Sequence, residues 1–101
     1  MSRTPIHPGE ILKDEIEGLK ISGTELARQI RVPANRVSKI SAGKRSITAD
    51  TALRLGKWFG TSPAFWLNLQ KSYDLKIAEH DIGKGIDDIK PLKRQTISAK
   101  F

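Results

Sequence analysis

Apolar and small residues recur at steps of three and four in two adjoining segments between Ser22 and Gly43, with a break at Arg31–Pro33. These positions are Leu26, Ala27, Ile30, Val32, Val37 and Ile40. Such spacing places the apolar side chains on one face of each of two short helices. Two short helices joined by a tight turn form the helix-turn-helix pattern, which is typical of DNA-binding proteins. We expect the two helices to come closest at Ala27, where a larger side chain would push them apart.

The sequence also marks where these two helices begin and end. Ser22 stands three residues before Glu25, as in a capping box, in which the hydroxyl accepts from the Glu25 N–H and the carboxylate reaches back. This predicts a helix from about Gly23. Pro33 suits the start of the next helix, and Gly43 is expected just past its end, with a positive φ.

Three further helices are predicted around this pair. The first covers about Pro8–Leu19, and its inward positions are Ile11, Leu12, Ile16 and Leu19. Thr48 caps a helix over Ala49–Phe59, which Gly60 ends and whose apolar stripe is Ala52, Leu55, Trp58 and Phe59. Ser62 and Pro63 then open a helix that runs to about Glu79. We therefore predict an all-α, five-helix domain over residues 1–80, with Trp58 and Phe59 in its core.

The last predicted helix carries apolar residues on more than one face, namely Phe65, Trp66, Leu67, Leu69, Tyr73, Leu75 and Ile77. This is more than the core of a small domain can absorb, so part of the helix is expected to meet a second copy of the chain. A dimer would also place two helix-turn-helix units in successive major grooves, about 34 Å apart. The predicted dimer interface consists of Trp66, Leu67, Leu69, Gln70 and Tyr73.

Residues 81–101 contain glycines, a proline and mixed charges, without a helical period. We expect a C-terminal tail that is extended or partly disordered. Ile86, Ile89 and Leu92 are expected to form a short extended segment, and the last several residues are expected to be mobile.

The positive charge of the chain is concentrated on the helix-turn-helix and its flanks. The 101 residues carry a net charge of +7, and the segment from Lys20 to Lys57, with nine basic and two acidic residues, has the same net charge. The first 19 residues sum to −2 and the last 44 to +2. A charge localised in this way favours an anionic partner such as nucleic acid over a general role in solubility.

Several other classes of function are not supported. The chain has no cysteine, no apolar run of about 18 residues and no apolar signal-peptide core, so we expect neither a disulfide nor a membrane segment, and a cytoplasmic location. His7 and His80 are isolated, without metal-ligand spacing, and are expected to be exposed to solvent. Without a phosphate-binding loop, a nucleophile motif or paired carboxylates, we expect no catalysis, cofactor or metal.

The segments HPGEIL, SGTELARQIRVPANRVSKISAGKRSITADTALRLGKWFG and SPAFWLNLQKSYDL resemble the HigA group of antitoxins, within the phage-repressor-like helix-turn-helix proteins. The resemblance spans about Ile6 to Leu75. It implies a dimeric five-helix antitoxin that binds a partly palindromic operator before its own toxin–antitoxin operon. It also implies a cognate toxin partner, a small protein similar to RelE-type ribosome-dependent mRNA endonucleases, which the antitoxin neutralises. Many relatives have glycine in the turn where this chain has Arg31, and a left-handed conformation there would cost about 1 kcal/mol.

In helix-turn-helix proteins the second helix presents its first turns to base edges. The predicted base-reading residues are Ala34, Asn35, Arg36, Ser38 and Lys39. Asn pairs well with adenine, and Arg or Lys with guanine. By analogy with phage repressors, the predicted phosphate contacts are Ser22, Gly23, Thr24, Lys44, Arg45 and Ser46. For each of these positions the alternative is an ordinary solvated surface, and Arg28 and Arg31 are equally compatible with both roles.

Two other functions remain open at this stage. A stand-alone repressor would share the DNA chemistry but would have no toxin partner. A protein-interaction module would use the basic face for an acidic protein or RNA, and would show no preference among duplex sequences.

Overall fold

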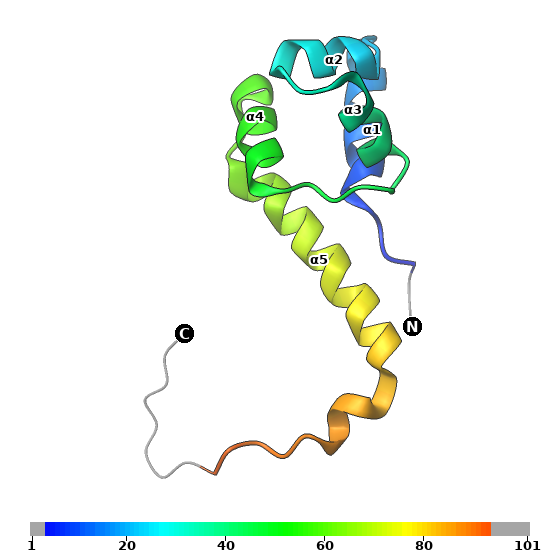
Figure 1. The fold of residues 1–101 in the computed structure, drawn as a ribbon, viewed down its shortest axis with the longest axis vertical. Coiled ribbons are helices and arrows are strands. Elements are labelled where there is room, and N and C mark those ends of the chain that lie inside the picture. Colours follow the sequence, from blue (N-terminus) through cyan, green and yellow to red (C-terminus); the bar gives the residue numbers. More distant parts are fainter. Residues whose placement is uncertain (1–3, 94–101) are drawn as a thin grey trace.

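The computed structural model describes residues 4–93, which form five α-helices and a final 3₁₀ helix (Figure 1). They are α1 (Pro8–Leu19), α2 (Gly23–Ile30), α3 (Ala34–Ser41), α4 (Ala49–Phe59), α5 (Pro63–Ile82) and η1 (Gly83–Asp88). No strand occurs within this part of the chain. The predicted all-α, five-helix fold is confirmed, and the predicted bounds of α1 and α4 match the structure.

The first four helices gather into a head from which α5 extends as a long arm (Figure 1). Each of the five α-helices contributes to one buried cluster, which consists of Leu12, Ile16, Leu26, Ala27, Ile30, Val37, Ile40, Ile47, Ala52, Leu55 and Trp66. Only the first turns of α5 reach this cluster, through Trp66. The second half of α5 therefore leaves the head with much of its surface uncovered.

The division of residues between the core and the dimer interface differs from the sequence prediction. Trp66 is 1% exposed and its indole N–H donates to the Thr61 hydroxyl at 3.1 Å, so it belongs to the core of the protomer. Gln70, also buried, accepts from the backbone N–H of Ile47 through its side-chain oxygen at 2.8 Å. Neither side chain has free surface to offer to a second copy, so both are wrongly assigned to the dimer interface. Trp58 and Phe59 are half-buried and pack against the core.

Helices α1 and α3 approach so closely that only glycine fits between them. A Cβ atom on Gly9 would lie 1.7 Å from the backbone oxygen of Ile40. For α2 and α3 the helical period predicts the closest approach at Ala27, which is fully buried, but it does not predict the close contact of α1 with α3 at Gly9. The pairing of α1 with the C-terminal half of α3 depends on this missing side chain.

The helix starts follow the predicted caps. The hydroxyls of Ser22, Thr48 and Ser62 accept from backbone N–H groups three residues later, at 3.0, 3.4 and 3.2 Å. The capping box is only half formed, because the Glu25 carboxylate binds Arg28 and Gln29 instead of reaching back. The hydrogen bond from Arg28 is the main reason why the pKa of Glu25 is lowered.

Two expectations at helix ends are wrong. Leu19 is 51% exposed, because it is the last residue of α1 and the chain turns directly afterwards at Lys20, which has φ of 60°. Helical structure also continues past Glu79, since α5 runs to Ile82 and Ile86 lies in η1 rather than in an extended segment. Residues 89–93, which include the exposed Ile89 and Leu92, have no regular secondary structure. The expected mobility of the last residues falls largely on 94–101, outside the described residues.

His7 is buried, contrary to the expectation of a solvent-exposed side chain. Its Nδ1 atom accepts from the Gly9 N–H at 2.8 Å and so caps α1, while its ring packs edge-on against Tyr73 of α5, 4.8 Å between centroids. Burial lowers the pKa of His7, although the nearby carboxylates of Asp74 and Glu10 act in the opposite direction. The imidazole therefore links α1 to α5 in its neutral form.

We expect the protein to lose stability in mild acid because protonated Nδ1 cannot accept the Gly9 hydrogen bond. The folded pKa lies below the ordinary value of 6.5, so the unfolded chain binds the proton first. The free energy of unfolding should fall as the pH drops from about 6.5 through the folded pKa, by about the 1 kcal/mol that an N-cap contributes. Thermal unfolding followed by circular dichroism between pH 7.5 and 5 measures this loss.

His7→Asn is the matched control, because asparagine caps helices without titrating in this range. Its melting temperature should change less over the same interval. An identical pH dependence in both proteins would contradict a role for His7.

Candidate nucleic-acid interface

The outward face of α3 is formed by the polar and small side chains expected to read bases. Ala34, Asn35, Ser38 and Lys39 are exposed, whereas Val37 and Ile40, on the opposite face, are buried against the head. The Ser38 hydroxyl donates to the backbone oxygen of Asn35 at 3.1 Å. The helix thus presents an amide, which can donate to N7 and accept from N6 of adenine, and an ammonium group, which can donate to O6 and N7 of guanine in the major groove.

Arg36 does not share this outward face. Its side chain is 18% exposed and points toward α4, where Nη1 lies 3.4 Å from the hydroxyl of Thr51 and 3.8 Å from a carboxylate oxygen of Asp50. The sequence prediction that Arg36 reads bases is therefore not supported by its position. A contact between residues 15 positions apart depends on the packing of α3 on α4, which the spacing within one helix cannot show.

The predicted phosphate contacts lie at two places beside α3. Ser22, Gly23 and Thr24 form the start of α2, where Ser22 and Thr24 are exposed, Gly23 is half-buried, and the Ser22 hydroxyl is already used as the cap. The loop after α3 carries Lys44, Arg45 and Ser46, all exposed.

The charge on this surface is not neutralised by the acidic residues around it. In residues 4–93 the ion pairs are Arg28–Glu25, Arg36–Asp50 and Arg54–Asp50. None of them involves Lys39, Lys44 or Arg45. Three cations from α3 and the loop after it are thus available to a polyanion.

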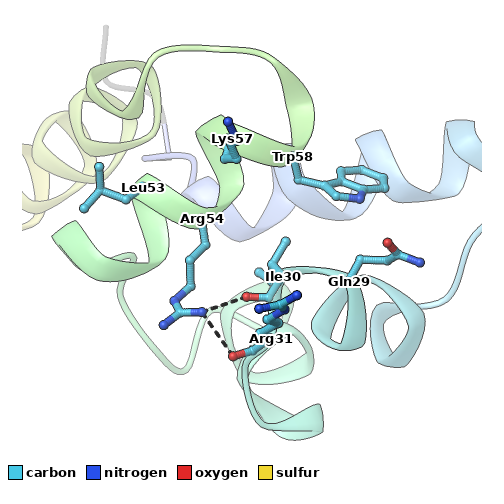
Figure 2. A pocket seen from close by; sticks show the side chains of 7 residues that line it. All are labelled: Gln29, Ile30, Arg31, Leu53, Arg54, Lys57 and Trp58. Carbon is cyan, nitrogen blue, oxygen red and sulfur yellow. Dashed lines mark hydrogen bonds between the residues drawn. The ribbon is translucent and has the colours of Figure 1, made fainter.

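The turn between α2 and α3 is held from α4. Arg31 has φ of 62°, the left-handed conformation considered for this position because many relatives have glycine there. The guanidinium Nη1 of Arg54 donates to the backbone oxygens of Ile30 and Arg31, at 2.9 and 3.1 Å (Figure 2). These three residues contribute to the lining of a groove between α2 and α4, whose other lining residues are Gln29, Leu53, Lys57 and Trp58.

Comparison with known proteins agrees with this arrangement. The Helix-turn-helix family model matches residues 12–66, which run from α1 to the first turn of α5. A HigA-family addiction module antidote protein from Coxiella burnetii is 54% identical, with 89% of this chain and 100% of that chain covered and a TM-score of 0.86. The chain belongs to the HigA-type helix-turn-helix antitoxins.

Two further relatives connect this HigA-type chain to DNA and to antitoxin function. The Pseudomonas aeruginosa antitoxin HigA, solved with the higBA promoter, is 48% identical, covers 88% of this chain and 99% of its own, and has a TM-score of 0.83. Antitoxin HigA-1 of Vibrio cholerae is 35% identical over 91 residues, which are 89% of this chain and 86% of that protein. The family is one of DNA-binding transcription regulators.

Residues 4–93 contain no group of three His, Cys, Asp or Glu side chains placed to hold a metal ion. Within the same residues, no helix combines the length and apolar character needed to cross a membrane.

Proposed function

We propose that this HigA-type protein represses its own toxin–antitoxin operon by inserting α3 into the major groove of the operator. The observation that carries the proposal is the exposed face of Asn35, Ser38 and Lys39, flanked by the cations of the following loop. A relative 48% identical to this chain was solved with its own promoter, which supports the same role here. The DNA-binding unit proposed is the segment from residue 1 to 80.

The proposed contacts divide into reading and positioning. Asn35 and Lys39 bind base edges, with Ser38 and Ala34 beside them on the same face. Lys44, Arg45 and Ser46 bind phosphates, as do Ser22, Gly23 and Thr24 at the start of α2. Phosphate contacts place the protein on any duplex, whereas base contacts select the sequence.

The test is a titration of the protein against the DNA upstream of its own gene, with a scrambled duplex as control, at about 50–200 mM salt. We expect binding to the upstream DNA to persist at the higher salt, with two protomers per operator. Binding to the scrambled duplex should be weaker and should disappear as salt rises. Equal binding to both duplexes, abolished by salt, would reject operator recognition in favour of an acidic protein or RNA partner.

We further propose that the protein is a homodimer joined along α5. Ala64, Leu67, Lys71, Leu75 and Ala78 recur at steps of three and four and line a shallow groove along the helix. Leu75 is 56% exposed there. Of the five interface residues proposed from sequence, Leu67 lies on this stripe, whereas Leu69 and Tyr73 face a different groove beside the N-terminal segment.

Leu75→Asp should convert the dimer to a monomer, because the substitution removes an apolar contact and would bury a carboxylate, which loses its hydration, in the interface. Its exposed position means that the protomer itself should still fold. Sedimentation equilibrium measures the mass, and Leu53→Asp is the control, since Leu53 is 61% exposed on α4, away from the stripe. A dimer that survives Leu75→Asp would place the interface elsewhere.

We also propose that the protein neutralises a small toxin similar to RelE-type mRNA endonucleases. Membership of the HigA antitoxins supports this partner. The test is co-expression with the product of the adjacent reading frame, followed by co-purification and rescue of growth. If that frame encodes no toxin, the protein is a stand-alone repressor with the same DNA chemistry.

A further inference from the structure

We propose that Arg54 and Asp50 are positioning residues for DNA recognition, which fix the N-terminal half of α3 at the angle needed to read bases. The proposal rests on the proposed function, since it concerns how the reading helix is held. Neither residue lies on the outward face of α3, and both belong to α4.

The two halves of α3 are held in different ways. The C-terminal half is fixed by the core, because Ile40 is fully buried and its backbone oxygen lies against Gly9 of α1. The N-terminal half has less such support: its last residue, Val37, is buried in the core, but Pro33 provides no side-chain cap, and Ala34 and Asn35 are exposed. Yet this is the half that helix-turn-helix proteins place against bases. Contacts from α4 to the turn and to the first turn of α3 can therefore contribute to its orientation.

Arg54 supplies part of this support from α4. Its Nη1 atom donates to the Ile30 and Arg31 carbonyls, which end α2 and lead directly into the turn (Figure 2). Its Nε atom donates to the Asp50 carboxylate at 3.1 and 3.2 Å. One planar guanidinium thus ties the first turn of α4 to the end of α2.

Asp50 extends the same network to α3. A carboxylate oxygen that binds Arg54 at 3.1 Å lies 3.8 Å from Nη1 of Arg36, in the first turn of α3. The Arg36 guanidinium is also 3.4 Å from the hydroxyl of Thr51, which is 1% exposed. The end of α2, the start of α3 and the first turn of α4 are therefore joined through one carboxylate and two arginines.

The exposure of these groups favours a role in geometry over one in stability. The side chains of Arg54 and Asp50 are 39% and 60% exposed, and ion pairs in contact with water contribute little to the free energy of unfolding. Base recognition is far more sensitive to the orientation of α3, because a bidentate contact requires donor–acceptor distances close to 3 Å at both atoms. A small rotation of α3 would break such hydrogen bonds while the protein stayed folded.

Arg54→Lys tests the proposal because it keeps the positive charge and removes the branched, planar guanidinium. A lysine ammonium cannot reach two carbonyls and a carboxylate with the same planar geometry. We expect affinity for the upstream operator to fall about 10-fold, with affinity for a scrambled duplex and the salt dependence unchanged. Asp50→Asn should also lower the ratio of the two affinities, although the loss of a negative charge should strengthen binding to both duplexes.

Arg28→Lys is the matched control. Arg28 also pairs with a carboxylate, that of Glu25, at 2.6 Å, but both residues lie on α2 and neither holds another helix. The ratio of operator to scrambled affinity should be unchanged in this variant. All proteins are compared at a temperature where circular dichroism shows them fully folded.

The remaining outcomes each exclude the proposal for a different reason. A lower melting temperature for Arg54→Lys with an unchanged affinity ratio would show a purely structural role. An equal loss on both duplexes would show that Arg54 binds phosphate directly. If the unsubstituted protein itself fails to prefer its operator, the proposed function fails, and the positioning role fails with it.

Discussion

Gly9→Ala should destabilise the protein severely. The added Cβ would lie 1.7 Å from the oxygen and 2.7 Å from the carbonyl carbon of Ile40, and also 3.0 Å from the Cα of Ser41. All three are backbone atoms, so no side-chain rotation can relieve the overlap, and α1 must move away from α3. We expect a cost of more than about 3 kcal/mol, a large part of the 5–15 kcal/mol by which small domains are stable.

Gly18→Ala provides the control on the same helix. A Cβ at Gly18 meets no atom within 4 Å, so the substitution should stabilise α1 by about 0.5–1 kcal/mol. Urea unfolding followed by circular dichroism gives both values from the transition midpoints. Similar midpoints for the two variants would mean that α1 and α3 are not packed as described.

The double substitution Asn35→Ala with Lys39→Ala should abolish the preference for the operator. Each base contact of this kind discriminates by about 1–3 kcal/mol, so the loss of both corresponds to at least about 30-fold in specific affinity. Both side chains are exposed on α3, and the melting temperature should hardly change. Titration of operator and scrambled duplexes at one salt concentration measures the effect.

Lys44→Ala separates positioning from reading. It should weaken binding to both duplexes to the same extent and lower the salt slope by about one, because one phosphate fewer is neutralised by the protein. If the double variant at Asn35 and Lys39 showed this same uniform loss, the division between reading and positioning residues would be incorrect.

The elements of the fold were predictable because their signals are local. A hydroxyl three residues before a helical N–H marks a helix start at Ser22, Thr48 and Ser62 without reference to the rest of the chain. The glycines at 43 and 60 both have positive φ, as their places just past α3 and α4 predict. The helical period and the caps depend on residues within one or two turns of each other, so they can be recognised from a short stretch of sequence.

The errors concern contacts between distant segments. The place of Arg36 in the first turns of α3 predicts a DNA contact, but its partners are in α4. The sequence around His7 predicts an exposed side chain, because its partner Tyr73 lies 66 positions away. The apolar surface of α5 predicts a dimer contact at Trp66, because the sequence does not show how far the head covers α5. Each error follows from a packing choice that periodicity leaves open.

The hydrogen bonds by which Arg54 holds the turn at Arg31 are made only to main-chain oxygen atoms. Its strength is therefore independent of which side chain stands at position 31, even though glycine or asparagine would fit the left-handed backbone with less strain. The backbone conformation of the turn and the charge of the side chain at position 31 can therefore change independently. The turn can exchange a positive side chain for a neutral one, and so alter what approaches it, while the course of the chain into the recognition helix stays the same.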